Sequence, residues 1–113
     1  MFTSEDWRNP FGQYLTGGIL PQMHSEKYKL KRLAVPYFLH EGTLFKKGYD
    51  GHPLRCLGPD EAGEMIKEVH AGKCGEYQGK KKLYQCMLQM GYYWPTMKKD
   101  TTEVVKNCHS CQV

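Results

Sequence analysis

Long hydrophobic runs are missing from this chain. No apolar stretch in the 113 residues approaches the roughly 18 residues that a membrane-spanning helix needs. The first residues, MFTSEDWRNP, have neither the positively charged start nor the apolar stretch of a secretory signal peptide. Internal repeats and low-complexity tracts are also missing. We therefore expect one small intracellular domain with an appended segment, and no membrane partner.

Sequence motifs typical of enzymes are missing as well. The chain has no glycine-rich phosphate loop and no Ser–His–Asp order. Its carboxylates are scattered over predicted helix surfaces, without a paired-acid motif on strands. We therefore expect that the chain is not catalytic by itself.

The cysteines are odd in number: Cys56, Cys74, Cys86, Cys108 and Cys111. An odd count without a secretion signal argues against a disulfide framework. A Cys-x-x-Cys in a reducing compartment indicates either metal binding or redox chemistry. Redox pairs of the thioredoxin kind begin a helix after a strand, whereas this pair follows a predicted helix. Metal binding is therefore the favoured interpretation, with a redox pair or two unconnected structural cysteines as alternatives.

Basic residues are unevenly placed along the chain, whose formal net charge is +4. Residues 1–72 contain nine Lys or Arg and nine Asp or Glu, whereas residues 73–113 contain seven basic and three acidic residues. The second part includes two lysine clusters: Lys80, Lys81, Lys82, Lys98 and Lys99. Such clusters suit contact with a polyanion such as DNA, and a solvated basic face explains them as well.

Two short helices are predicted in the N-terminal part. Residues 5–18 have an amphipathic pattern, with Pro10 near the first turn. Ser25 is the candidate N-cap of a second helix, which Pro36 ends. The expected apolar face of that helix comprises Tyr28, Leu30, Leu33 and Ala34.

After residue 36, the spacing of the hydrophobic residues changes from that of a helix to that of β-strands. Residues 37–47 contain two short apolar runs separated by Glu41-Gly42, which is a hairpin signal, and residues 53–57 read as a third strand. Three helical patterns follow, over residues 59–72, 78–91 and 95–108. Because these helices are short and their apolar stripes narrow, the three-helix unit needs a further constraint to be stable.

The segment Cys108-His109-Ser110-Cys111 is the candidate constraint. Two thiolates at this spacing suit one tetrahedral Zn²⁺, at ~2.3 Å from each sulfur. The nearest upstream candidates for the remaining ligands are His70 and Cys74. The predicted fold class is therefore α+β and mainly helical: two N-terminal helices, a small β-hairpin or meander, then a three-helix unit stapled by zinc.

From about Tyr37 to its end, the chain resembles the zinc-binding N-terminal domain of retroelement integrases. This is the His-His-Cys-Cys type found in Gypsy-type LTR retrotransposon polyproteins. The matching stretches are LHEGTLFKKG, PLRCL, EVHAGKCGEYQG, GYYWPTMKKD and CHSCQ. Upstream, WRNPFGQYLTGGILP and KYKLKRLAVPYFLHEG resemble the helical segment that joins ribonuclease H to integrase in such polyproteins. The resemblance implies a linker over residues 1–36 and a zinc-binding domain over 37–113, with a meander at 37–58 and helices at 59–113.

Carried over to this chain, the family pattern assigns His70, Cys108 and Cys111 as zinc ligands and places Tyr77 at the position of the second histidine. Tyrosine is a poor zinc ligand, because its phenol ionises only near pH ~10. Three outcomes stay open. Cys74 takes the vacant place, or a three-ligand site binds zinc weakly together with water, or this copy has lost tight zinc binding.

The resemblance also implies a function. In integrases this module assists multimerisation and engages the DNA ends of the element, so we expect DNA, self-association or the rest of an integrase as partners, and a nuclear location. We expect a fragment of a retrotransposon polyprotein or of a derived gene, because the chain ends before a catalytic integrase core begins. The alternative is a protein–protein interaction domain with a degenerate zinc site, which the neutral charge of residues 1–72 favours for that half.

Overall fold

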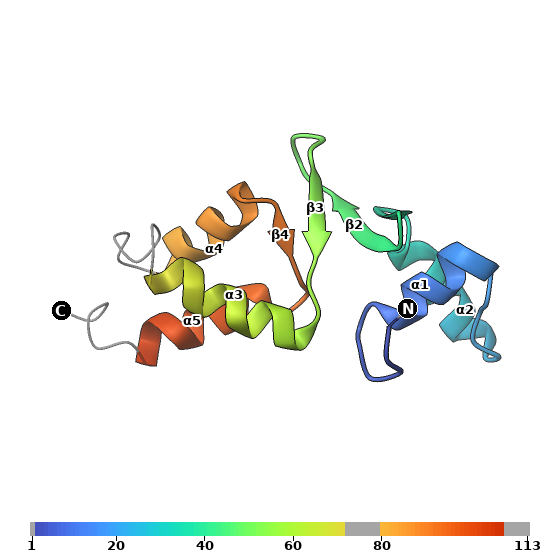
Figure 1. Cartoon of the computed structure of the whole chain (residues 1–113). Helices are drawn as coiled ribbons and strands as arrows, with labels where there is room; N and C mark the ends of the chain where they lie inside the picture. Colours follow the sequence, from blue (N-terminus) through green and yellow to red (C-terminus); the bar gives the residue numbers. More distant parts are fainter. Residues whose placement is uncertain (1, 72–79, 108–113) are drawn as a thin grey trace. The chain divides into compact units, whose positions relative to one another are not determined.

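The computed structural model describes residues 2–71 and 80–107, which fall into two compact units, Met1–Cys56 and Leu57–Val113 (Figure 1). The first unit contains α1 (Asn9–Gly17), α2 (His24–Leu33), β1 (Tyr37–His40), β2 (Thr43–Lys47) and β3 (Pro53–Cys56). The second contains α3 (Pro59–Ala71), α4 (Lys80–Gln89), β4 (Tyr92–Tyr93) and α5 (Met97–Asn107). The predicted α+β, mainly helical class is confirmed. The family boundary predicted at residue 36 stays a prediction.

A tight hairpin joins β1 to β2. Glu41 and Gly42 have φ angles of 51° and 79°, so both central residues are left-handed, as a two-residue turn of type I′ requires. This turn fixes an antiparallel register in which Phe38 lies opposite Phe45, and their rings stack with centroids 5.5 Å apart. The next strand, β3, pairs antiparallel with β2, which completes the meander predicted from the sequence.

Aromatic side chains pack α1 against β1. The ring of Phe11 on α1 stacks on Tyr37 of β1 at 4.5 Å between centroids, and Trp7 lies edge-on to both rings at 6.1 and 6.0 Å. Pro10 lies in the first turn of α1, as predicted, where its missing N–H costs no helical hydrogen bond. These three half-buried rings form an aromatic cluster within the first unit.

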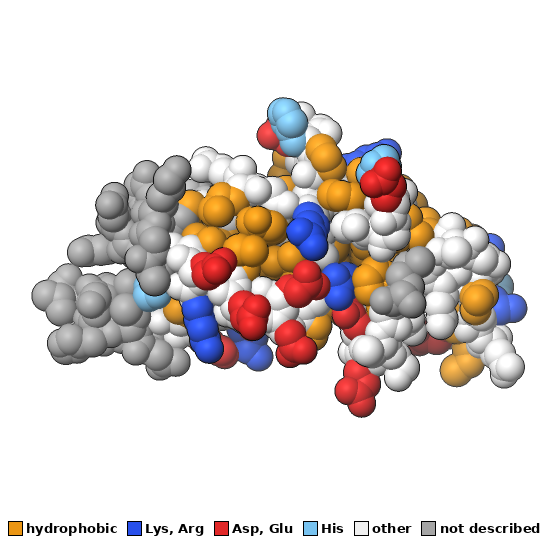
Figure 2. All heavy atoms as spheres, viewed as in Figure 1, with side chains coloured by type: hydrophobic (Ala, Val, Ile, Leu, Met, Phe, Trp, Pro, Cys, Tyr) orange, Lys and Arg blue, Asp and Glu red, His pale blue; other side chains and the backbone are white. Residues whose placement is uncertain are grey.

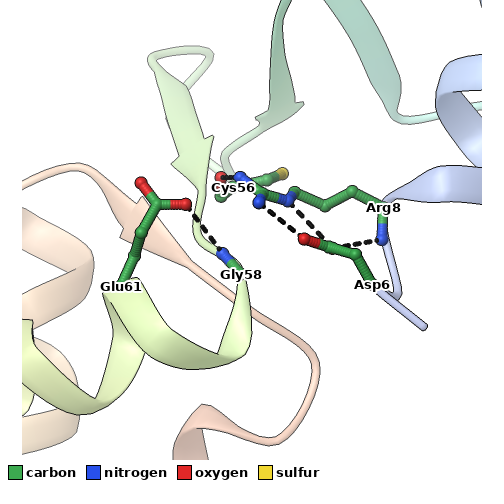
Figure 3. Close-up of polar contacts among 5 residues, drawn as sticks. All are labelled: Asp6, Arg8, Cys56, Gly58 and Glu61. Atoms are coloured by element: carbon green, nitrogen blue, oxygen red, sulfur yellow. Dashed lines mark hydrogen bonds and ion pairs between the residues drawn. The ribbon is translucent and has the colours of Figure 1, made fainter. Parts of the chain in front are cut away.

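Arg8 ties the N-terminal segment to the end of β3 (Figure 3). Its Nη2 and Nε atoms lie 2.7 and 3.0 Å from the two carboxylate oxygens of Asp6, and Nη1 donates to the Cys56 carbonyl oxygen at 3.2 Å. The hydrogen bond from Arg8 lowers the pKa of the Asp6 carboxyl below its usual value. Asp6 is therefore ionised at neutral pH, and its contribution to stability is lost only as the pH falls through that lowered pKa.

The second helix differs from its sequence-based description. Helix α2 begins at His24 after an extended Met23, so the prediction of Ser25 as N-cap is wrong. Leu30 and Ala34 are buried, whereas Tyr28 is 69% exposed and Leu33 is 46% exposed. Tyr28 and Leu30 are two residues apart and therefore point about 200° apart around a helix. The apolar face predicted for this helix is thus correct only on its Leu30–Ala34 side.

The second unit is a small three-helix bundle with a short apolar core. Helix α3 packs against α4 and α5, and α4 packs against α5. Among the described residues of this unit, the buried side chains are Leu57, Ala62, Ile66, Val69, Leu83, Met87, Trp94, Met97, Thr101 and Val105. Thr101 is the polar member of this set, and its hydroxyl donates to the Met97 carbonyl oxygen at 2.8 Å. No helix in the described part of the chain is both long and apolar enough to cross a lipid bilayer.

Candidate metal centre

Helix α3 carries His70 in its last turn. At the start of the helix, the Glu61 carboxylate accepts a hydrogen bond from the Gly58 backbone N–H at 3.3 Å, which is one half of a capping box (Figure 3). Ile66 and Val69 are buried along one side and hold the helix against the rest of the unit. His70 follows Val69 directly and is half-buried. Its imidazole is therefore carried on a helix whose start and side are both fixed.

Helix α5 leads to the predicted Cys-x-x-Cys. It runs to Asn107, so Cys108 is the next residue of the chain. Three side chains fix its start. The Trp94 indole N–H donates to Asp100 Oδ2 at 2.7 Å, and the Thr96 hydroxyl donates to the same oxygen at 2.8 Å. The helix begins at Met97 rather than at Pro95, because Thr96 and Asp100 together close its first turn.

The ends of the three helices meet at one end of the second unit. Figure 1 shows the end of α3, the start of α4 and the end of α5 side by side there, in agreement with the packing of α3 on both α4 and α5. The described parts of the chain that flank residues 72–79 and 108–113 therefore converge with His70. This is the arrangement that a metal clamp between His70 and a downstream cysteine pair requires.

The other predicted ligands, Cys74, Cys108 and Cys111, lie outside the described residues, as do Tyr77 and His109. Within residues 2–71 and 80–107, no three His, Cys, Asp or Glu side chains gather closely enough to hold a metal ion. The donor chemistry fits zinc, because an imidazole and thiolates are the ligands of structural zinc sites. The identity of the ligand set stays a prediction.

Cys56 is a buried thiol and not a ligand candidate. It is 1% exposed at the end of β3 in the first unit. Burial raises the pKa of its thiol to about 12, against the smaller opposing effects of the Arg8 and Lys46 charges. A thiol with this pKa remains protonated at neutral pH and is a weak nucleophile and metal ligand. Cys56 is therefore a small core residue of the first unit.

The predicted lysine clusters occupy two helix starts. Lys98 and Lys99 lie in the first turn of α5 and are exposed. Lys80, Lys81 and Lys82 begin α4, where the structure describes their backbone but not their side chains. Cations at a helix N-terminus oppose the helix dipole, so these positions have an electrostatic reason to attract an anion.

The Trp94–Asp100 hydrogen bond was not predicted from the sequence, in which Tyr92, Tyr93 and Trp94 indicate packing at a helix–helix corner or, as the less favoured alternative, stacking on nucleic-acid bases. Trp94 is 3% exposed and does belong to the core, but the two tyrosines are half-buried and form β4. The signal available was a Thr four residues before an Asp, where a helix was expected to begin.

Asp100→Ala is expected to lower the free energy of unfolding of the zinc-loaded second unit by about 1–3 kcal/mol, because the buried indole N–H then loses its partner. Asp100→Asn, which keeps one side-chain oxygen acceptor, should lose less. Thermal unfolding followed by circular dichroism measures both. Equal melting temperatures for the parent and both variants would contradict a structural role for this pair.

Comparisons with known proteins identify a family for the second unit. Residues 58–113 match the family described as integrase zinc binding domain. Gypsy retrotransposon integrase-like protein 1 of Mus musculus is 28% identical over 91 residues, which cover 79% of this chain and 17% of that protein. An uncharacterized mitochondrial protein of Arabidopsis thaliana is 34% identical over 70 residues, which cover 60% of this chain and 49% of that protein.

The chain thus spans about half, or less, of the length of these curated relatives. The family match begins at residue 58, where the second compact unit also begins within one residue. It includes His70 and the Cys-x-x-Cys, so the sequence positions expected of a zinc clamp lie inside the matched segment. Residues 58–113 therefore form an integrase zinc-binding domain, and the chain is related to Gypsy-type retrotransposon integrase-like proteins.

Proposed function

We propose that this chain is a zinc-stapled module of a retrotransposon polyprotein, or of a gene derived from one, that assists DNA binding and multimerisation during DNA integration. The match of residues 58–113 to the integrase zinc-binding family carries the proposal. The convergence of the ends of α3 and α5 supports it, because those ends bear or precede the candidate ligands. The chain contributes binding and assembly, and strand joining belongs to a separate catalytic core.

In this proposal His70, Cys74, Cys108 and Cys111 hold the metal. Bound zinc would supply a cross-link between the end of α3 and the segment after α5, and no reaction chemistry. The protein's own part is to present the ligands. The Glu61–Gly58 hydrogen bond at the start of α3 and the Trp94–Asp100 contact at the start of α5 fix the helix that bears His70 and the helix that precedes Cys108 in the sequence.

DNA contact is assigned to the two lysine clusters. Lys98 and Lys99 are exposed on the first turn of α5, and Lys80–Lys82 begin the neighbouring helix α4. Helices α4 and α5 pack against each other, so both clusters belong to one compact unit. Self-association or docking on the rest of an integrase would use other surfaces of the same chain, in the nucleus of the cell.

Binding of the zinc-loaded chain to duplex DNA, followed by fluorescence anisotropy at several salt concentrations, tests the proposal. We expect the affinity to fall as salt rises, and Lys98→Gln/Lys99→Gln to reduce the slope of log affinity against log salt by up to about 1.8, which is ~0.9 for each lost phosphate contact. Lys47→Gln/Lys67→Gln removes the same charge from exposed positions elsewhere and serves as the control. Absence of salt-dependent binding would refute the DNA role.

Tyr77 favours one alternative function. Because a tyrosine stands where the family has its second histidine, a weak zinc site is compatible with a protein–protein interaction domain that has no nucleic-acid role. In that case the titration above shows no salt-dependent binding to DNA. Native mass spectrometry of freshly purified protein then shows whether metal is bound.

A further inference from the structure

The division of the chain into units changes how its charge is distributed. Residues 1–72 sum to zero, but this stretch crosses the boundary between the units. Unit Met1–Cys56 has eight basic and five acidic residues, a net charge of +3. Residues 57–72 have one basic and four acidic residues, a net charge of −3, and Figure 2 shows acidic side chains gathered over α3. The first unit is therefore basic, although the net charge of residues 1–72 is zero.

Helix α2 accounts for this excess. It contains four basic residues and one acidic residue, Glu26, so its net charge of +3 equals that of the whole unit. Its cations are Lys27, Lys29, Lys31 and Arg32. No ion pair of these cations is found within residues 2–71 and 80–107. The positive charge of α2 is therefore not neutralised inside the described part of the molecule.

The exposed side of α2 combines charge with an aromatic ring. His24, Tyr28, Lys31 and Arg32 are spaced at i, i+4, i+7 and i+8, which places them on one face of a helix. All four are exposed, and the His24 and Tyr28 rings meet edge-on with centroids 5.8 Å apart. Lys29 is exposed beside this face. We call these five residues the α2 outer face.

The chemistry of this face fits a phosphate backbone better than a lipid surface. Lys and Arg neutralise phosphates, and Tyr hydroxyls donate hydrogen bonds to phosphate oxygens. A helix that lies in a membrane surface needs an apolar face free for insertion. The apolar side of α2 leaves little to insert, because Leu30 and the C-cap residue Ala34 are buried in the first unit and Leu33 is only 46% exposed.

We propose that the α2 outer face binds the sugar–phosphate backbone of duplex DNA, as a contact surface separate from the lysine clusters of the second unit. The choice of DNA as the ligand rests on the function proposed above, whereas the surface itself rests on the charge and exposure of α2. The first unit would then not be a neutral linker, since it would carry DNA contacts of its own.

Anisotropy titrations of the zinc-loaded full chain with a labelled duplex test this surface. Lys31→Gln/Arg32→Gln should reduce the slope of log affinity against log salt by about 1.8 and weaken binding roughly tenfold or more at 0.1 M salt. Lys47→Gln/Lys67→Gln, with the same loss of charge at exposed positions, should change binding less. Tyr28→Ala should weaken binding without reducing the slope, because it removes no charge. Circular dichroism checks that each variant is folded.

Repeating the titrations with chelator present distinguishes the contribution of the first unit to DNA binding from that of the second. Because α2 lies in unit Met1–Cys56 and no candidate zinc ligand does, DNA binding that remains after chelation should still be weakened by Lys31→Gln/Arg32→Gln. If this variant behaves like the control while Lys98→Gln/Lys99→Gln weakens binding, the α2 proposal is overturned and the proposed function stands. A larger effect of the variant on binding to vesicles of anionic lipid than on DNA would also overturn it.

Discussion

Chelation of zinc is expected to unfold the second unit completely and to leave the first unit folded. The core of the second unit is short, and a three-helix unit of this size has little stability of its own. Zinc binding in small structural sites contributes roughly 10–16 kcal/mol, which exceeds the ~5 kcal/mol stability of a small domain. Cys108→Ser should have the same effect, because it removes one of the candidate thiolate ligands.

Tryptophan fluorescence can follow this unfolding, because each unit contains one tryptophan. Trp7 belongs to the half-buried aromatic cluster of the first unit, and Trp94 is buried in the second. In a Trp7→Phe background, the emission of Trp94 should shift to longer wavelength when chelator is added. Native mass spectrometry gives the metal content before and after. Cys56→Ala is the matched control, since it removes a cysteine of the first unit and should leave the zinc content unchanged. Retention of the buried Trp94 signal in metal-free protein would contradict the prediction.

The second large effect is expected for the fourth zinc ligand, because Tyr77 occupies the position of the family's second histidine. If Cys74 is the fourth ligand, as we expect, Cys74→Ser should weaken zinc binding by roughly a hundredfold or more, since even residues that only support a ligand account for ~10–100-fold. Restoring the family's histidine with Tyr77→His in the Cys74→Ser background should recover much of that affinity. Competition against a chromophoric chelator measures each affinity.

The single variants distinguish the three ligand arrangements. Tyr77→His alone should change little when Cys74 already completes the site. A large gain from Tyr77→His, with no loss from Cys74→Ser, would instead indicate a three-ligand site. No measurable zinc binding in the parent chain, gained only with Tyr77→His, would indicate a copy that has lost its metal.

Local chemistry made much of the fold predictable. Glu41-Gly42 predicted a two-residue hairpin, because it lies between two short apolar runs and Gly42 adopts a left-handed conformation at little cost; both residues have positive φ angles in the structure. Gly91 is the last residue of the helical pattern predicted over residues 78–91, and it has a φ angle of 94° two residues after the end of α4. Of the candidate site, the position of His70 at the end of a helix followed from the apolar stripe of α3.

Other features depend on tertiary contacts that no local pattern specifies. Tyr28 has the character of a core residue, but the inner side of α2 is defined by Leu30 and Ala34, so Tyr28 is exposed. The short strand Tyr92–Tyr93 was not predicted, since it depends on partners far away in the chain, such as Leu57, whose N–H donates to the Tyr93 carbonyl oxygen at 2.9 Å. The net charge of residues 1–72 likewise gave no sign of the basic helix α2, because the acidic helix α3, which belongs to the other unit, was included in the sum.

The buried thiol at the end of β3 makes quantitative cysteine labelling practical in this protein. Because the Cys56 thiol stays protonated up to a pKa of about 12 and is 1% exposed, alkylating reagents at pH 8 should leave it unmodified while the first unit is folded. In isotope-coded alkylation followed by mass spectrometry, the Cys56 peptide is thus an internal blank. Labels gained on other cysteines after chelation then report the release of metal, and a label on Cys56 itself reports loss of the first unit's fold.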